Sequence, residues 1–409
     1  MPASILRDTD AEKGDRVGFI ELFFDLVFVF AATQLSHRLI TDGSLEGVLE
    51  SLVMFLAIWS VWTMTTWVTN WLDVERNRVR ALLLALMVGG IFQSLAVPDA
   101  FKFTLDAWAF AIVHIVMQLG RALFVALATR GRHERLHLHF VRTATWMGLA
   151  APFWIWGAWV PGDERLGWWA AAVAVEYGAS AARYWLPGLG GSAPADYHVA
   201  PAHFAERCGL FVIIALGEGV LITGGTVGEL TRDLPTTGAL MVALLTVMAM
   251  WWIYFSYSAE KGTEAVERAR DPGKVARTVY VYLHIPLIIG MLVSAAGDEP
   301  LVTHPSDLAK WSEAALVLGG PALFLGGATA IKRYVCDAWM ASHLAGIVAL
   351  GAVAPFATRL DLLTLSASAM AVLIAVATWE ELAIRAKRRA EGRPVSHDAE
   401  QELDMAEVG

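Results

Sequence analysis

Charge and cysteine are both scarce in this chain. Asp, Glu, Lys and Arg make up 17% of the 409 residues, whereas soluble domains contain about 25%. The two cysteines, Cys208 and Cys336, argue against a disulfide framework and against a zinc site built from paired CxxC motifs. The sequence also lacks a Walker motif, HExxH, GxSxG and a glycine-rich dinucleotide fingerprint. These absences exclude the enzyme classes that such motifs identify.

Long apolar runs take the place of the missing charge. Hydrophobic residues make up 56% of the chain, and the mean hydropathy is +0.51. An apolar run of about 20 residues is long enough to cross the hydrocarbon layer as a helix. We therefore predict an all-α polytopic membrane protein with about 12 transmembrane helices. The predicted spans are 18–38, 48–68, 80–97, 104–128, 141–160, 166–186, 204–224, 237–257, 275–296, 312–331, 338–357 and 361–384.

Lys and Arg are unevenly shared between the predicted loops. If the N-terminus faces the cytoplasm, 22 of the 31 Lys and Arg residues fall on the cytoplasmic side and six on the other. This asymmetry follows the positive-inside rule. We therefore predict that both termini are cytoplasmic. The N-terminal tail, 1–17, has no apolar core of a cleaved signal peptide, and the C-terminal tail, 385–409, is rich in charge.

Weak internal similarity divides the chain into two halves. The segment SLAVP follows Gly90 and VSAAG follows Gly290, and LGRALF (119–124) matches GGPALF (319–324) at the same offset. Similarity in this order predicts two parallel six-helix repeats, 18–186 and 204–384, joined by a linker at 187–203. A pseudo-two-fold axis along the membrane normal would relate them.

Ionisable residues within the spans predict a polar interior in the first half. Residues spaced by three, four or seven positions share one face of a helix. Three predicted helices carry such a face: Glu21 and Asp25 on the first, His114, Gln118 and Arg121 on the fourth, and Glu176, Ser180 and Arg183 on the sixth. An unpaired charge in hydrocarbon is costly, so we expect Glu21 and Asp25 to face Arg121 and Arg207. We assign Asp25 a functional role and Glu21 a largely structural one.

The seventh predicted helix adds Glu206, Arg207 and Glu218 to the candidate substrate- or ion-binding residues. Glu218 lies between two glycines, which allow a backbone or ligand to approach closely. Glu218, Glu176 and His114 have no obvious basic partner in the sequence. Such groups can exchange protons near neutral pH. The alternative is that all these charges only lock helices together.

Tryptophans suggest a second kind of site. Trp59, Trp62 and Trp252 lie deep enough in their spans to line an aromatic cavity for an apolar or cationic ligand. Packing against lipid is the alternative. The histidines of RHERLHLHF (132–140) have no acid or cysteine nearby to complete a metal site, so we predict no metal and no cofactor. The basic clusters lie next to the membrane, where anionic lipid accounts for them without nucleic acid.

Two segments carry a family resemblance. ELFFDLVFVFA (21–31) and HFAERCGLFVIIALGEGVL (203–221) resemble the bacterial low temperature requirement protein A family, and the resemblance covers essentially the whole chain. Glu21, Asp25, Glu206, Arg207 and Glu218 match the family's signatures. Gly219 departs from them, because a serine commonly follows the glutamate. The resemblance implies a multi-pass protein of the bacterial inner membrane, and it brings no settled biochemical activity.

Three functions fit these features. The first is a proton- or ion-coupled transporter of a small solute, with a polar site between the repeats. The second is an integral-membrane enzyme that acts on a lipid or isoprenoid-like substrate by acid–base chemistry. The third is a non-catalytic membrane-stress accessory protein. Membrane lipid is the partner common to all three, the solute or ion is unidentified, and homo-oligomerisation stays open.

Overall fold

The computed structural model describes residues 5–7, 17–193, 199–229, 233–256, 258–337 and 339–390, and helices dominate this part of the chain. In order, the helices are α1 (Phe19–Thr41), α2 (Leu45–Trp71), α3 (Asn77–Ala96), η2 (Val97–Asp99), α4 (Leu105–Thr129), α5 (Glu134–Trp159), α6 (Gly162–Ala181), α7 (Pro201–Glu229), α8 (Leu234–Phe255), α9 (Ser258–Glu267), α10 (Pro272–Ala276), η4 (Arg277–Tyr282), α11 (His284–Thr303), α12 (Trp311–Cys336), α13 (Ala341–Val353), η5 (Ala354–Arg359) and α14 (Leu362–Ala390). Within the same residues, β-structure is limited to isolated bridges. The all-helical prediction is confirmed.

Among the described residues, ten helical segments are long and apolar enough to cross a membrane. Each of the twelve predicted spans contains a helix, with ends shifted by a few residues. Two of these helices, α5 and α6, are long enough to span but are less apolar than the other ten. Their tryptophans contribute to this, because indole is amphipathic and favours the membrane interface. Twelve spans in two repeats therefore stay a prediction. The sequence did not predict α9, which is short and charged.

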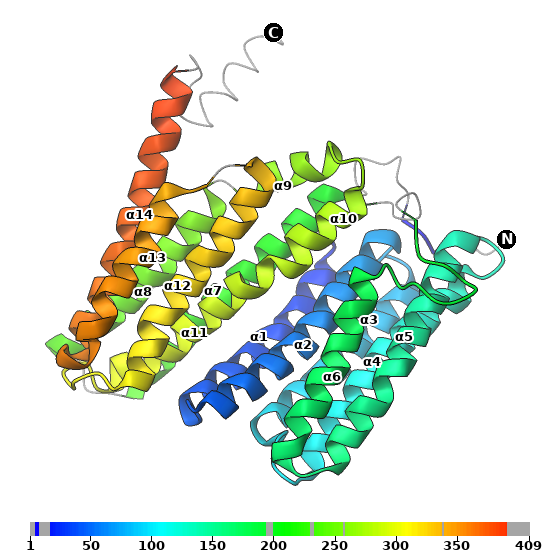
Figure 1. The fold of residues 1–409 in the computed structure, drawn as a ribbon, viewed down its shortest axis with the longest axis horizontal. Coiled ribbons are helices and arrows are strands. Elements are labelled where there is room, and N and C mark those ends of the chain that lie inside the picture. Colours follow the sequence, from blue (N-terminus) through cyan, green and yellow to red (C-terminus); the bar gives the residue numbers. More distant parts are fainter. Residues whose placement is uncertain are drawn as a thin grey trace.

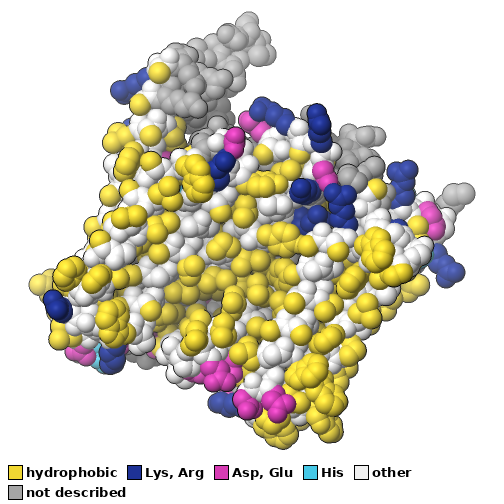
Figure 2. Space-filling model, in the orientation of Figure 1, with side chains coloured by type: hydrophobic (Ala, Val, Ile, Leu, Met, Phe, Trp, Pro, Cys, Tyr) yellow, Lys and Arg dark blue, Asp and Glu magenta, His cyan; other side chains and the backbone are white. Residues whose placement is uncertain are grey.

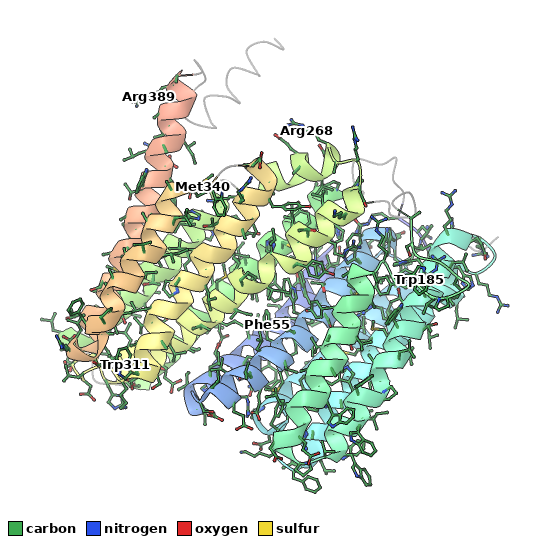
Figure 3. The ribbon with its side chains drawn as sticks, viewed as in Figure 1. Phe55, Trp185, Arg268, Trp311, Met340 and Arg389 are labelled. Carbon is green, nitrogen blue, oxygen red and sulfur yellow. The ribbon has the colours of Figure 1, made fainter. Side chains whose placement is uncertain are left out.

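The helices form two groups that meet at a long seam (Figure 1). One group contains α1 to α6 and the other α7 to α14, and α1 and α2 pack against α7 and α11 where the groups meet. Phe55 of α2 lies at this seam (Figure 3) and stacks on Trp59, with ring centroids 6.2 Å apart. The seam brings the first helix of each group together, so residues near positions 20 and 205 become neighbours.

Charge is concentrated at the two ends of the bundle. Figure 2 shows Lys and Arg gathered at the upper end, with a broad hydrophobic surface between that end and the lower one. Arg268, Met340 and Arg389 lie toward the upper end, and Trp311 lies toward the lower one (Figure 3). This arrangement is typical of a multi-pass membrane protein. The assignment of the upper end to the cytoplasm rests on the positive-inside rule and stays a prediction. Residues 391–409 of the predicted C-terminal tail lie outside the described residues.

Small residues bring α11 and α12 into backbone contact. A Cβ atom built on Gly320 would lie 2.6 Å from the Ser294 backbone nitrogen, and one built on Gly290 would lie 2.4 Å from the Phe324 nitrogen. Such distances are too short for real atoms, so glycine is required at both positions. Close backbone approach is how helices associate in lipid, where there is little hydrophobic force between them. This contact holds α11 in place, and α11 forms part of the seam.

We predict that Gly320→Ala destabilises the protein by about 1–3 kcal/mol, the usual cost of overpacking. The added methyl group would push the α12 backbone away from Ser294. Thermal unfolding in detergent, followed by tryptophan fluorescence, measures the loss. The matched control is Gly319→Ala on the next residue, where an added Cβ meets nothing within 4 Å. Equal melting temperatures for the two variants would contradict the close contact.

The predicted topology can be tested with single cysteines in a chain whose Cys208 and Cys336 are replaced by alanine. The side chains of Arg268 and Lys310 are both 79% exposed and lie near opposite ends of the bundle. We expect a membrane-impermeant maleimide to label Lys310→Cys in intact spheroplasts and Arg268→Cys only in inverted vesicles. The reverse pattern would place the termini outside the cytoplasm.

Candidate functional site

Four charged or titratable side chains join α1 to α7 in the interior. Arg207 donates to Asp25 Oδ1 at 2.7 Å and its guanidinium lies 3.6 Å from Glu21 Oε1. His203 Nε2 is 2.8 Å from Glu21 Oε1. Trp62 of α2 donates its indole N–H to Asp25 Oδ1 at 2.7 Å. We call Glu21, Asp25, His203 and Arg207 the seam lock, because they connect the two groups of helices.

The seam lock is fully enclosed. All four side chains are inaccessible to solvent, so the two carboxylates and the guanidinium depend on one another for the interactions that water would supply. The Arg207 guanidinium also lies over the Trp62 ring, 5.6 Å from its centroid. A buried, hydrogen-bonded ion pair of this kind holds helices in register. The expected contact between Arg207 and Asp25 is confirmed, whereas the separate functional role for Asp25 stays a prediction.

A second polar group surrounds Glu176 in the first half. His114 Nε2 lies 2.9 Å from Glu176 Oε1, and Gln93 lies 3.1 Å from the other ring nitrogen of His114. Three further donors reach the carboxylate: Trp154 at 2.9 Å, Ser60 at 3.2 Å and Gln118 at 3.2 Å. The sequence reading that Glu176 and His114 lack partners is therefore wrong, because α4 and α6 bring them together. Their mutual hydrogen bond crosses between helices that are not adjacent in sequence.

Arg121 does not reach the seam lock. Its guanidinium hydrogen-bonds to Gln118, to the Val61 carbonyl oxygen at 3.2 Å and to Thr65 Oγ1 at 3.1 Å. All three partners are neutral. The predicted contact of Arg121 with Glu21 and Asp25 is wrong because the side chain ends on α2 rather than on α1. Arg207 occupies the place that the sequence reading assigned to both arginines, and the second guanidinium near Glu21 is that of Arg7, 3.6 Å from Glu21 Oε2.

Glu218 and Asp298 are carboxyl groups on two helices that pack together, α7 and α11, and neither makes an ion pair among the described residues. Glu218 Oε2 accepts a hydrogen bond from Thr33 of α1 at 2.8 Å, and its other oxygen is buried without a partner. Asp298 of α11 is 7% exposed and has no hydrogen bond or ion pair among the described residues. Asp298 packs against α7 one residue further on, because a Cβ atom on Gly219 would lie 3.3 Å from Asp298 Oδ2. The sequence analysis missed Asp298, although it lies in an apolar run with no basic residue nearby.

A buried triad in the second half was also missed. Lys332 hydrogen-bonds to Glu380, and His343 Nε2 lies 3.2 Å from the other oxygen of Glu380. Thr329 lies 3.2 Å from the remaining ring nitrogen of His343. The sequence analysis counted Lys332 among the loop residues, and this is corrected by its 1% exposure inside α12. The sequence contained one indication of this buried group, because Glu380 is an acidic residue within the predicted span 361–384.

Three candidate residues lie outside these groups. Arg183 follows the end of α6, is 40% exposed and pairs with Asp271. Glu206 is exposed on α7 and accepts a hydrogen bond from the Val17 backbone. Trp252 is 46% exposed, so it does not join Trp59 in a cavity.

The other two tryptophans are buried in stacked contact. The Trp59 and Trp62 rings are 4.8 Å apart, and Trp59 donates its indole N–H to the Val281 carbonyl. Trp59 lines an apolar pocket at the seam with an empty volume of about 350 Å³, together with Phe55 and Phe211. The predicted aromatic cavity of Trp59, Trp62 and Trp252 is therefore replaced by a packed aromatic stack.

We predict that Asp25→Asn lowers the free energy of unfolding by about 3 kcal/mol or more, because the buried Arg207 loses its compensating charge. Unfolding in mixed detergent micelles with sodium dodecyl sulfate measures the change. Glu206→Gln is the matched control and should stay within about 0.5 kcal/mol, since Glu206 is exposed. The double variant Asp25→Asn with Arg207→Gln should recover part of the loss. An Asp25→Asn variant as stable as the control would contradict a lock.

The chain is similar to known bacterial proteins over most of its length. The family model described as "Bacterial low temperature requirement A protein (LtrA)" matches residues 16–378. An uncharacterized protein of Rhizobium meliloti (strain 1021) is 37% identical over 389 residues, which cover 93% of this chain and 92% of that protein. No solved structure matches the chain significantly. Because the matched range covers most of its length, the chain belongs to the bacterial low temperature requirement A family.

Proposed function

We propose that this protein is a proton-coupled membrane transporter of a small solute and that Glu218 and Asp298 carry the proton. The observation behind this proposal is the contrast between matched and unmatched carboxyl groups. Glu21 and Asp25 have Arg207, Glu176 has His114, and Glu380 has Lys332. Glu218 and Asp298 alone in this set make no ion pair among the described residues; His37 of α1 acts on Glu218 only through space.

A carboxyl group inside a membrane protein is expensive unless it is paired or neutralised by a proton. Where a cation is present, the carboxylate is held in the charged form and its proton is not needed. Where none is present, proton uptake removes the charge. Unpaired carboxyl groups therefore are the groups that can load and release a proton as a transport cycle proceeds, and proton relays in carriers are built from such residues.

The Thr33 hydroxyl can serve both states of Glu218. It lies 2.8 Å from Glu218 Oε2 and 3.1 Å from the Val29 carbonyl oxygen. A hydroxyl has one proton to donate and two lone pairs to accept with. When Glu218 is ionised, Thr33 donates to it. When Glu218 is protonated, Thr33 donates to Val29 and accepts from Glu218, so a proton can come and go without loss of the contact.

The location of the pair also favours coupling. Thr33 belongs to α1 in the first group of helices, and Glu218 and Asp298 belong to α7 and α11 in the second. A change of charge at this position alters the interactions across the seam. Relative movement of two halves about a central site is how many carriers alternate between the two sides of the membrane.

The two alternative functions have weaker support. A lipid-directed enzyme needs a chamber for an acyl or isoprenoid chain, and the tryptophans proposed for it do not surround one space: Trp59 and Trp62 stack on each other and Trp252 is 46% exposed. A purely structural role accounts for the seam lock. It does not explain why the protein buries Glu218 and Asp298, which destabilise it without forming an ion pair. We therefore favour transport.

The test has a protonation arm and a flux arm. We expect infrared difference spectra of the protein in liposomes, taken between acidic and neutral pH, to contain a carboxylic acid C=O band. Glu218→Gln and Asp298→Asn should each remove part of this band. In liposomes loaded with the pH dye pyranine, a panel of small carboxylates, phosphates and amino acids should include a solute that drives proton flux, and both variants should reduce that flux at least tenfold.

Glu299→Gln is the matched control, because Glu299 follows Asp298 on α11 and is 32% exposed. It should leave the infrared band and the flux unchanged. An unchanged band in both Glu218→Gln and Asp298→Asn would refute the proton role. The absence of solute-driven proton flux above protein-free liposomes across the panel would refute coupled transport.

A further inference from the structure

A pocket at the seam lies between α2, α4, α5, α6 and the start of η4. Its empty volume is about 430 Å³, enough for an ion of a few atoms. Its lining includes Trp67, Trp71, Arg121, Ser180, Tyr184 and Arg277.

Two guanidinium groups line this pocket, and no acidic residue does. Arg277 is 8% exposed and makes no side-chain hydrogen bond or ion pair among the described residues. Arg121 is 2% exposed, and its partners Gln118, Thr65 and Val61 are all neutral. Two buried positive charges that share a space lined by no acidic side chain repel each other and lose hydration. Arg121 reaches the nearby Glu176 carboxylate only indirectly, through Gln118. An anion between them would relieve both penalties.

The chemistry of the lining suits an oxyanion. A guanidinium presents a planar fork of N–H donors that matches the oxygens of a carboxylate or phosphate. The Ser180 hydroxyl also lines the pocket and makes no hydrogen bond among the described residues, so it is available as a further donor. The aromatic side chains of Trp67 and Trp71 keep the local dielectric low, which strengthens the attraction of the arginines for an anion.

The backbone at Arg277 is unusual as well. Residues Arg277–Tyr282 form a π-helical turn between α10 and α11. Such turns are rare and often occur at functional sites. Here the turn carries the arginine of the second group of helices to a pocket that is otherwise built from the first group.

We propose that this pocket binds a small oxyanion, either a carboxylate or a phosphate group, between Arg121 and Arg277. The site is distinct from the carboxyl pair and does not depend on the proton-coupled function. Arg277 and Asp298 are 21 residues apart along nearly continuous helix, which corresponds to roughly 30 Å. Because the two arginines come from opposite sides of the seam, a bound anion bridges the two groups of helices.

The ligand has two possible sources, a solute dissolved in water and the phosphate of an anionic lipid. The pocket lies toward the end of the bundle where Lys and Arg gather (Figure 2), which is where anionic headgroups also accumulate. Both sources offer the same oxygens to the two arginines. The experiment therefore has one arm for each.

The first arm titrates purified protein in detergent with sodium phosphate and with sodium acetate, at constant ionic strength against sodium chloride. Binding is read from the quenching of tryptophan fluorescence and from the melting temperature. We expect saturable binding that Arg277→Gln weakens about tenfold or more, because a charge-assisted hydrogen-bond donor is lost. Arg277→Lys should retain part of the affinity. The second arm counts phosphatidylglycerol molecules retained by each variant in native mass spectrometry.

Arg268→Gln is the matched control, since Arg268 lies at the same end of the bundle and is 79% exposed. It should bind phosphate, acetate and phosphatidylglycerol as the unmodified protein does. Loss of phosphate or acetate binding in Arg277→Gln identifies a soluble anion, and loss of one phosphatidylglycerol identifies a headgroup. If Arg277→Gln and Arg268→Gln match the unmodified protein in both arms, the proposal is overturned.

Discussion

The structure depends on the requirement that a charge buried among apolar helices must be matched by another group. Arg207 is the clearest case, because its guanidinium lies between Asp25 and Glu21 with no access to water. Its partners come from α1, about 180 residues earlier in the chain. The cost of leaving any member unpaired in this environment is large. The match therefore fixes the register of α1 on α7, and with it the seam between the two groups of helices.

The same requirement separates structural from functional charges. Glu176 with His114 and Glu380 with Lys332 are each paired inside their own group of helices, and Arg207 is paired with Asp25 across the seam. Two other sets form no ion pair among the described residues: the carboxyl groups of Glu218 and Asp298, and the guanidinium groups of Arg121 and Arg277. Proteins depart from local consistency mainly at functional sites. Both of our proposals rest on these departures, one as a place for a proton and the other for an anion.

The sequence predicted which faces of the helices are polar but not which residues meet. His114, Gln118 and Arg121 do share one face of α4, as their spacing required. Their partners depend on how far α4 lies from α1 and α2, and the spacing contains no information on that distance. Lys332 shows a related limit. It lies at the end of an apolar run beside Arg333, where a loop and a buried turn of helix have the same local composition.

The sequence by itself determined the membrane class, the positions of the helices, the polar stripes and the family. These properties are local, because twenty apolar residues or a repeat of 3.6 residues can be recognised within one segment. The tertiary structure decided that Arg207 rather than Arg121 neutralises Asp25, that Asp298 packs against α7 at Gly219, and that Arg277 faces Arg121 across the seam. Each of these pairings joins different helices, so it depends on which helices pack together and at what depth, and no single segment specifies that.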